Sequence, residues 1–269
     1  MERDELIERI SQRPVWRCSR GEWQHLDDLV VTEFAATIYL NGNELVTLLC
    51  SPEYLEDLAV GFLSGEGLLA GADDLESVKA DYQLGQVWVT SRGTSVLAEK
   101  TFLKRYLTTG CGKGTTFYSL DDSLRAAPLE SSLRIAQEKI SESTRAFQDR
   151  SELFHQTGGV HSAALGDDGG IRLFREDLGR HNALDKLIGC CVREGIDPGG
   201  FFLMVSGRIS SEILMKSVKA GLQIVISRSA PTSLAVDLAE RLGVTLIGFA
   251  RGGRFNVYCH RDRVVEAGT

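Results

Sequence analysis

The sequence predicts an α/β protein with a large C-terminal sheet domain that carries helices on both faces and a smaller N-terminal α+β portion. Three observations support this fold class. The second half of the 269-residue chain alternates short apolar runs with segments of helical period. The apolar runs are continuous, which indicates strands buried on both faces in a mostly parallel sheet. The first half instead combines a hairpin, one helix and further strands.

The N-terminal portion begins with a predicted β-hairpin over residues 29–49. Residues 41–43 (Asn-Gly-Asn) form a turn signal between two stretches rich in β-branched and aromatic side chains. Pro52 can open a helix that continues to Leu63 and ends at the glycines beyond it. A second strand pair is predicted at residues 86–90 and 95–98.

The elements of the C-terminal domain follow at regular intervals. A segment with a helical period, residues 131–147, is predicted to bridge the two halves, and a hairpin follows at residues 161–174. Helices are then predicted at residues 181–193, 210–220 and 233–242, and strands at residues 201–205, 222–227, 244–249 and 255–260. The boundary falls within residues 121–128, so we divide the chain into domains 1–125 and 126–269.

Composition excludes several classes of protein. With 43% hydrophobic and 25% charged residues, the chain has an ordinary globular balance, and disorder is not expected. No apolar run approaches the ~18 residues of a membrane span, and the charged start is unlike a secretory signal, so we expect no membrane association and a cytoplasmic protein. A net charge of -7 argues against nucleic-acid binding. A basic cluster near the C-terminus suits a small phosphorylated ligand: Arg251, Arg254, His260, Arg261 and Arg263.

One of the six cysteines stands in an unusual context. The cysteines form no CxxC pair, so neither a disulfide framework nor a zinc site is indicated, and about five of them are expected to be packed or incidental. Cys111 instead lies in the glycine-rich run LTTGCGKGTTF at residues 107–117. Lys113 would favour its thiolate form if the loop brings the ammonium group near. The residues alone leave two interpretations open, a nucleophile or sulfur carrier and an incidental exposed thiol.

The loops that follow the C-terminal strands are the candidate binding region. Ligands of open α/β sheets gather at the carboxyl ends of the strands, where small residues and arginines can hold phosphate. The competing interpretation is that Ser and Thr only cap helices and that glycines only end them. Four such loops at one expected edge favour a phosphorylated ligand: residues 176–182, 206–208, 228–233 and 250–254.

The histidines do not indicate a metal centre. His161 and His181 could be ligands, acid/base groups or structural side chains. A zinc deaminase would need an H-x-E motif and a later P-C-x-x-C motif, and the sequence around and after His161 has neither. We therefore predict no intrinsic metal.

Several strings together resemble the formate dehydrogenase accessory sulfurtransferases, the FdhD family. They are CGKG, FHQTGGVHSAAL, EDLGRHNALDKLIG, SGRISSEILMKSVKAG, SAPTSLAVDLAERLGVTLIGF and RGGRFNVY, and the likeness extends over about residues 29–260. The resemblance implies a carrier that accepts sulfur from a cysteine desulfurase as a persulfide. The carrier would deliver that sulfur to the molybdenum or tungsten bis(molybdopterin guanine dinucleotide) cofactor of formate dehydrogenase, held as cargo. It also implies a C-terminal domain similar in fold to cytidine deaminases but without their zinc, and, by analogy, a homodimer.

The resemblance assigns roles to individual residues. Cys111 matches the first cysteine of the family's C-G-x-C-G loop and would carry the persulfide on a mobile glycine tether, whereas Gly114 stands where the family has its second cysteine. The cofactor-binding stretch, together with the loops predicted above, comprises Phe249, Ala250, Arg251, Gly252, Gly253, Arg254, Ser206, Arg208, Ser229 and Thr232. Two alternatives remain, a cofactor-binding chaperone that moves no sulfur and a deaminase-like hydrolase.

Overall fold

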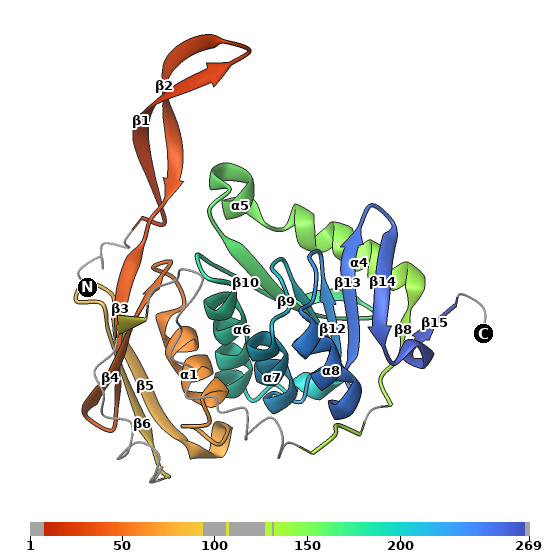
Figure 1. Ribbon diagram of the computed structural model, residues 1–269. Helices are drawn as coiled ribbons and strands as arrows, with labels where there is room; N and C mark the ends of the chain where they lie inside the picture. The colour runs from red at the N-terminus through yellow and green to blue at the C-terminus, as the bar shows by residue number, and fades with distance from the viewer. Residues whose placement is uncertain (1–7, 94–105, 108–126, 131, 267–269) are drawn as a thin grey trace.

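A computed structural model describes residues 8–93, 106–107, 127–130 and 132–266 of the protein. Its body consists of successive layers: an N-terminal sheet, helix α1, a layer of three helices, a C-terminal sheet and helix α4 (Figure 1). The predicted α/β class is confirmed. Within the described part of the chain, no helix is both long and apolar enough to span a membrane.

The N-terminal sheet contains the predicted hairpin. Strand β3 (Phe34–Leu40) pairs antiparallel with β4 (Asn43–Cys50) across a turn in which Asn41 and Gly42 both have positive φ. Helix α1 (Leu55–Gly65) covers one face of the sheet and buries Leu55, Leu58 and Phe62 against it. The predicted helix is present, but it begins at Leu55 and not at Pro52.

The sheet has the order β5-β6-β3-β4-β7. Strand β6 (Gln86–Ser91) is the predicted strand at residues 86–90, and it pairs parallel with β3. Its antiparallel partner is β5 (Leu75–Asp81), which sequence analysis missed. The partner predicted at residues 95–98 lies outside the described residues, and β7 (Tyr106–Leu107) completes the other edge.

The C-terminal sheet has six strands in the order β10-β9-β11-β12-β13-β14. The prediction of a mostly parallel sheet holds only for its centre, where β11 and β13 flank β12 in parallel. The pairs β9–β10 and β13–β14 are antiparallel because they are hairpins, and a short turn can join only antiparallel neighbours. Strand β9 also pairs antiparallel with β11. The strands are β9 (His161–Asp167), β10 (Gly170–Asp177), β11 (Phe202–Val205), β12 (Ile224–Ser227), β13 (Thr245–Arg251) and β14 (Arg254–Cys259).

Helices cover both faces of this sheet, as predicted. Helices α6 (Arg180–Glu194), α7 (Ser211–Lys219) and α8 (Ser233–Leu242) enclose the larger core on one face. Helix α4 (Gln137–Asp149) packs Ile140 and Phe147 against the other face. The short α5 (Glu152–Thr157) leads from α4 into β9, and two short strands, β8 (Ile135–Ala136) and β15 (Val264–Val265), pair beside α4.

Helices α1 and α6 join the two halves at a backbone contact. A Cβ built on Gly61 would lie 1.7 Å from the carbonyl oxygen of Asp185, and one built on Gly189 would lie 1.8 Å from that of Asp57. Only glycine fits at either place, and the two glycines let the helices approach more closely than side chains allow. The domain division at residue 125 stays a prediction, since residues 121–126 lie outside the described part.

Strands β1 (Ile10–Ser19) and β2 (Glu22–Val31) form a two-stranded ribbon, the arm, which stands out from the body (Figure 1). Sequence analysis did not predict the arm. It is anchored at its base, where Val31 packs on Gly159 and Arg9 lies 3.6 Å from the carboxylate of Glu53.

Candidate functional site

The loops after β11, β12 and β13 meet at the carboxyl edge of the C-terminal sheet. Ile209 N donates a hydrogen bond to the Ala230 carbonyl (3.2 Å), and Thr232 N donates to the Ile209 carbonyl (2.9 Å). Phe249 N donates to the Ser229 carbonyl (3.1 Å). Three of the four predicted loops therefore lie side by side, as the topology of parallel strands requires.

Some of the Ser and Thr residues at this edge cap helices, as the competing structural interpretation predicted. Thr232 caps α8 by accepting a hydrogen bond from Ala235 N at 3.3 Å, and Ser210 caps α7 in the same way through Ile213 N at 3.4 Å. Ser229 N donates to Ser227 Oγ at 2.9 Å, which holds the start of its loop. The contacts of Thr232 and Ser229 thus position the loops.

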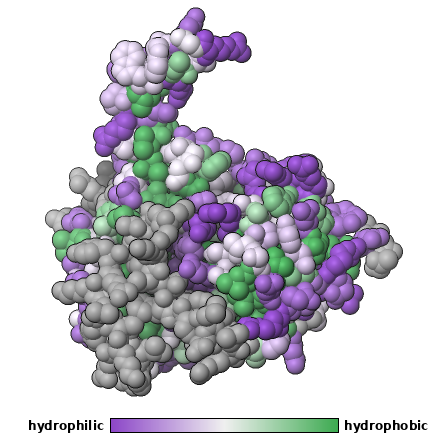
Figure 2. Space-filling model, in the orientation of Figure 1, coloured by the Kyte–Doolittle hydropathy of each residue, from purple (hydrophilic) through white to green (hydrophobic). Residues whose placement is uncertain are grey.

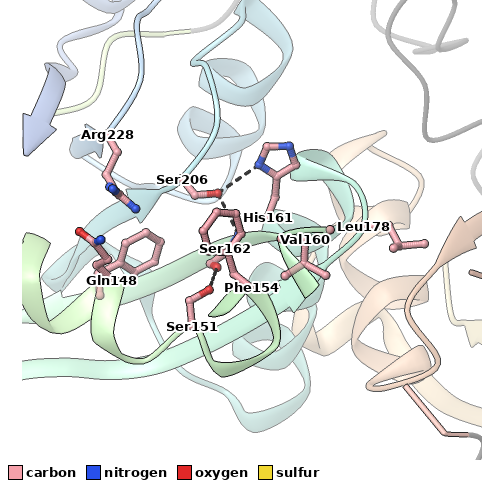
Figure 3. Close-up of a pocket in the computed structure, with 12 residues that line it drawn as sticks. Gln148, Ser151, Phe154, Val160, His161, Ser162, Leu178, Ser206 and Arg228 are labelled. Carbon is pink, nitrogen blue, oxygen red and sulfur yellow. Dashed lines mark hydrogen bonds between the residues drawn. The ribbon is translucent and has the colours of Figure 1, made fainter. Parts of the chain in front are cut away.

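A cavity of about 310 Å³ opens at the same edge, between β9 and helices α4 and α5 (Figure 3). Ser206 Oγ lies 3.1 Å from His161 Nδ1 and accepts a hydrogen bond from Ser162 N at 3.0 Å. Ser162 Oγ in turn lies 2.8 Å from Ser151 Oγ, so a chain of polar groups lines the wall. The cavity is lined by Phe147, Gln148, Ser151, Phe154, Gly158, Gly159, Val160, His161, Ser162, Leu178, Ser206 and Arg228. Of the predicted binding residues, only Ser206 is in this lining.

Two arginines give the cavity region its positive charge. The Nε atoms of Arg180 and Arg228 are buried, and neither has a hydrogen-bond partner among the described residues. The side chain of Arg180 passes over Gly207, where an added Cβ would lie 3.2 Å from two of its carbons and 3.3 Å from His161 Nδ1. Buried donors are nearly always satisfied in native proteins, so these two Nε–H groups are candidate donors to a bound anion.

The surroundings of the cavity histidine favour its neutral form. Burial lowers the pKa of His161, and the positive charge of Arg180 and the neighbouring His181 lower that pKa further. A neutral imidazole can accept a hydrogen bond from the Ser206 hydroxyl group, which fits the 3.1 Å contact. The region therefore presents two fixed cations and a neutral polar wall.

The predicted cofactor stretch at residues 249–254 divides into two parts. Ala250 is buried in the core beside α4, and Phe249 is held at positive φ by its bond to Ser229. Residues 251–254 form the tip of the β13–β14 hairpin, with Gly252 and Gly253 at φ values of +58° and +78°. The tip arginines, Arg251 and Arg254, are paired in register and exposed, as Arg208 is on its own loop. These residues lie outside the cavity lining.

The predicted carrier cysteine and its neighbour, Cys111 and Gly114, lie outside the described residues. Four of the five described cysteines are buried, and burial raises the pKa of each thiol, to about 12 for Cys50 and Cys191 and to about 11 for Cys259. Buried thiols with raised pKa values are poor nucleophiles. The fifth, Cys18, is exposed on the arm.

The fourth predicted loop, residues 176–182, is mostly structural. Asp177 is fully buried and accepts hydrogen bonds from Gly179 N and Asn182 Nδ2. His181 Nε2 lies 3.0 Å from the carboxylate of Glu212, which accounts for the lowered pKa of Glu212. The described residues contain no group of three or more His, Cys, Asp or Glu side chains arranged to hold a metal ion.

Sequence reasoning did not single out Arg180 and Arg228 as binding residues. Both arginines lie in loops that were predicted to bind a ligand because of their position after strands of the C-terminal sheet. Their distinguishing property is a buried Nε–H group without an acceptor among the described residues, and that property exists only after the chain has packed.

Comparison with known proteins shows relatives over nearly the whole chain. A model of the FdhD/NarQ family matches residues 31–265. The chain is 44% identical over 254 residues to the "Sulfur carrier protein FdhD" of Bacillus subtilis, which covers 94% of this chain and 97% of that protein. It is 42% identical to the protein of the same name from Listeria innocua, with 95% and 98% covered. A crystal structure of a putative formate dehydrogenase accessory protein from Desulfotalea psychrophila superposes with a TM-score of 0.80 at 26% identity, over 96% of this chain and all of that one.

Proposed function

The chain belongs to the FdhD/NarQ family, and on that premise we propose that it is a sulfur carrier whose carrier group is the thiol of Cys111. The observation that carries the proposal is the full-length similarity, above 40% identity, to proteins named sulfur carriers. The described cysteines narrow the choice of carrier thiol, because four of them are buried with raised pKa values and Cys18 is the one exposed thiol among them.

The transfer that we propose begins at a cysteine desulfurase that holds a persulfide. The Cys111 thiolate attacks the outer sulfur of that persulfide, one S–S bond forms as the donor's S–S bond breaks, and the donor leaves as a thiolate. No external oxidant or reductant is needed for this step. Glycine restricts the backbone least of all residues, so the glycine-rich sequence around Cys111 suits a carrier that must reach both donor and recipient.

The recipient that we propose is the molybdenum bis(molybdopterin guanine dinucleotide) cofactor of formate dehydrogenase, bound as cargo at the carboxyl edge of the C-terminal sheet. Two features of this edge suit a nucleotide diphosphate. Arg180 and Arg228 offer buried donors without acceptors, and the exposed arginines of the β13–β14 tip add further cations in an otherwise acidic protein. We propose a homodimer as the working form.

Replacement of the carrier thiol tests the proposal in cells. In a strain that lacks its own accessory protein, wild-type protein should restore formate dehydrogenase activity, and Cys111→Ser should restore none while remaining folded. Cys18→Ser is the matched control, since it removes an exposed thiol elsewhere. Full activity with Cys111→Ser would reject the sulfur carrier and favour a chaperone that binds the cofactor without moving sulfur.

A further inference from the structure

The N-terminal sheet has one face covered by helix α1 and a second face turned away from it. The covered face buries Ile38, Val46 and Val87 in the same core as the α1 side chains. Since successive residues of a strand point to opposite faces, the alternate residues lie on the second face, the outer sheet face. In Figure 1 the α-helices all lie on the α1 side of this sheet. The register places these residues on the outer sheet face: Ala35, Thr37, Tyr39, Thr47, Leu49, Lys79, Gln86 and Trp88.

An aromatic pair lies at the centre of the outer sheet face. The Tyr39 and Trp88 rings stack with their centroids 5.9 Å apart, and Trp88 is 38% exposed. Thr37 Oγ1 and Thr47 Oγ1 are hydrogen-bonded at 2.9 Å beside the pair. The exposed Lys79 lies opposite Trp88 in the register. Aromatic side chains with few charges among them are typical of the centre of a protein–protein interface.

The position of Cys111 along the chain identifies the partner. Strand β7 pairs with β4 at the edge of this sheet, and Cys111 follows Leu107 by four residues. A chain spans at most about 3.6 Å per residue, so the Cys111 Cα lies within ~14 Å of the Leu107 Cα by every path the chain can take. Neighbouring strands are ~4.8 Å apart, which places β3 and β6 at ~10 Å and ~14 Å from β7. The aromatic pair on these two strands is therefore as close to β7 as the reach of Cys111.

The sulfur donor has to enter this range. The exchange forms an S–S bond between Cys111 and the outer sulfur of the donor persulfide as the donor's own S–S bond breaks, so the two sulfurs must touch. Helix α1 occupies the covered face of the sheet, and the outer sheet face is the one left for a donor.

The arm is the other surface with exposed tryptophans, and its distance from β7 excludes it. Trp16 and Trp23 are exposed on the arm, which stands clear of the body (Figure 2). Trp23 is eight residues from the arm's base at Val31, or ~27 Å along the strand. A contact there is about twice the reach of Cys111 away from the sheet.

We propose that the outer sheet face is the docking surface for the protein that donates sulfur, with Tyr39 and Trp88 at its centre. The inference rests on the proposed carrier role of Cys111 and adds the place where the donor binds. Docking there brings the donor persulfide to the N-terminal sheet, whereas the proposed cargo site lies at the carboxyl edge of the C-terminal sheet.

The affinity of the purified protein for a cysteine desulfurase, measured by calorimetry without cysteine so that no sulfur moves, tests the surface. Trp88→Glu should raise the dissociation constant about tenfold or more, because it puts a carboxylate at the centre of the interface. Lys79→Glu changes an exposed side chain and should raise the dissociation constant about threefold or more. An unchanged thermal midpoint would show that each variant folds.

Tyr258→Glu is the matched control for Trp88→Glu. Tyr258 is also an aromatic residue, is also 38% exposed, and lies on β14 at the far edge of the other sheet (Figure 1). The Tyr258→Glu variant should bind the desulfurase with the affinity of the wild type.

The rate of persulfide formation, measured with cysteine present, gives a second readout. Trp88→Glu should raise the half-saturating concentration of the carrier by the same factor as the dissociation constant, and it should leave the maximal rate unchanged because the exchanging sulfurs are unchanged. A change in the maximal rate alone would contradict a docking role.

The calorimetry separates this inference from the carrier function. A wild type that does not bind the desulfurase, an affinity that both Trp88→Glu and Lys79→Glu retain, or an equal loss in Tyr258→Glu would overturn the docking surface. Normal persulfide formation in the last two cases would leave the carrier function standing. A wild type that binds the desulfurase through Trp88 but never gains sulfur would reject the carrier and keep the docking surface.

Discussion

Lys186→Met is expected to destabilise the protein strongly, because it removes the cation from a buried ion pair at the junction of the two halves. Lys186 Nζ lies 2.6 Å from Asp177 Oδ2, and both side chains are fully buried. Lys186 Nζ also donates to Ser51 Oγ at 2.7 Å, and Ser51 N donates to the same carboxylate at 3.0 Å. The pair therefore links β10 and α6 to the end of β4.

The expected size of the loss follows from what remains around the carboxylate. Breaking a buried pair by removing one partner costs about 3–5 kcal/mol, since the other charge stays buried. Asp177 keeps donors from Ser51, Gly179 and Asn182, which places the cost near the lower end, ~3 kcal/mol. For a chain of this size the thermal midpoint then falls by roughly 6–12 °C.

Thermal unfolding of three variants tests this reasoning. Arg172→Met removes a cation at a similar distance, 2.8 Å from Asp167, but that pair is on the surface and should cost at most about 1 kcal/mol. Lys186→Met combined with Asp177→Asn removes both charges and should lose less stability than Lys186→Met alone. A midpoint for Lys186→Met equal to that of Arg172→Met would refute the importance of the buried charge.

Two further predictions concern the helix contact and the cargo site. Gly61→Ala should destabilise the protein by more than about 3 kcal/mol, because its methyl group would lie 1.7 Å from a carbonyl oxygen of α6. The control Gly200→Ala, whose added methyl group has no neighbour within 4 Å, should change the unfolding midpoint little, and equal midpoints for the two variants would contradict the backbone contact. Arg251→Ala and Arg254→Ala should each weaken the binding of guanosine diphosphate about tenfold or more, as measured by calorimetry. The control Arg172→Ala, at the opposite end of the sheet, should leave the affinity unchanged. Unchanged affinity in both tip variants would place the nucleotide elsewhere.

Most of the C-terminal fold could be predicted because its sequence signals are local. The helix predicted at residues 233–242 has the observed bounds, and the strand predicted at residues 201–205 differs from β11 by one residue. Both segments have an apolar pattern bounded by residues that cap or turn. The prediction wrongly extended parallel pairing to the outer strands of the sheet. A continuous apolar run indicates that a strand is buried, but it does not indicate whether the neighbouring strand runs parallel or antiparallel.

The arm and the arginines were missed for a different reason. The sequence of β1 contains Pro14 and two arginines with little apolar alternation, so its partner β2 is recognisable only from their register. The Nε atoms of Arg180 and Arg228 become buried without a partner only when the chain folds, and no local sequence pattern reports this. The loops that hold them could be predicted from topology, but their role could not.

The central claim, that Cys111 carries sulfur, is tested most directly by the intact mass of the protein after incubation with a cysteine desulfurase and cysteine. The wild-type chain should gain the mass of one sulfur atom, and a reductant that cleaves persulfides should remove it. Cys111→Ala should gain nothing, whereas Cys18→Ala should gain the same mass as wild type. A wild-type mass that does not change, or an equal gain in Cys111→Ala, would contradict the claim.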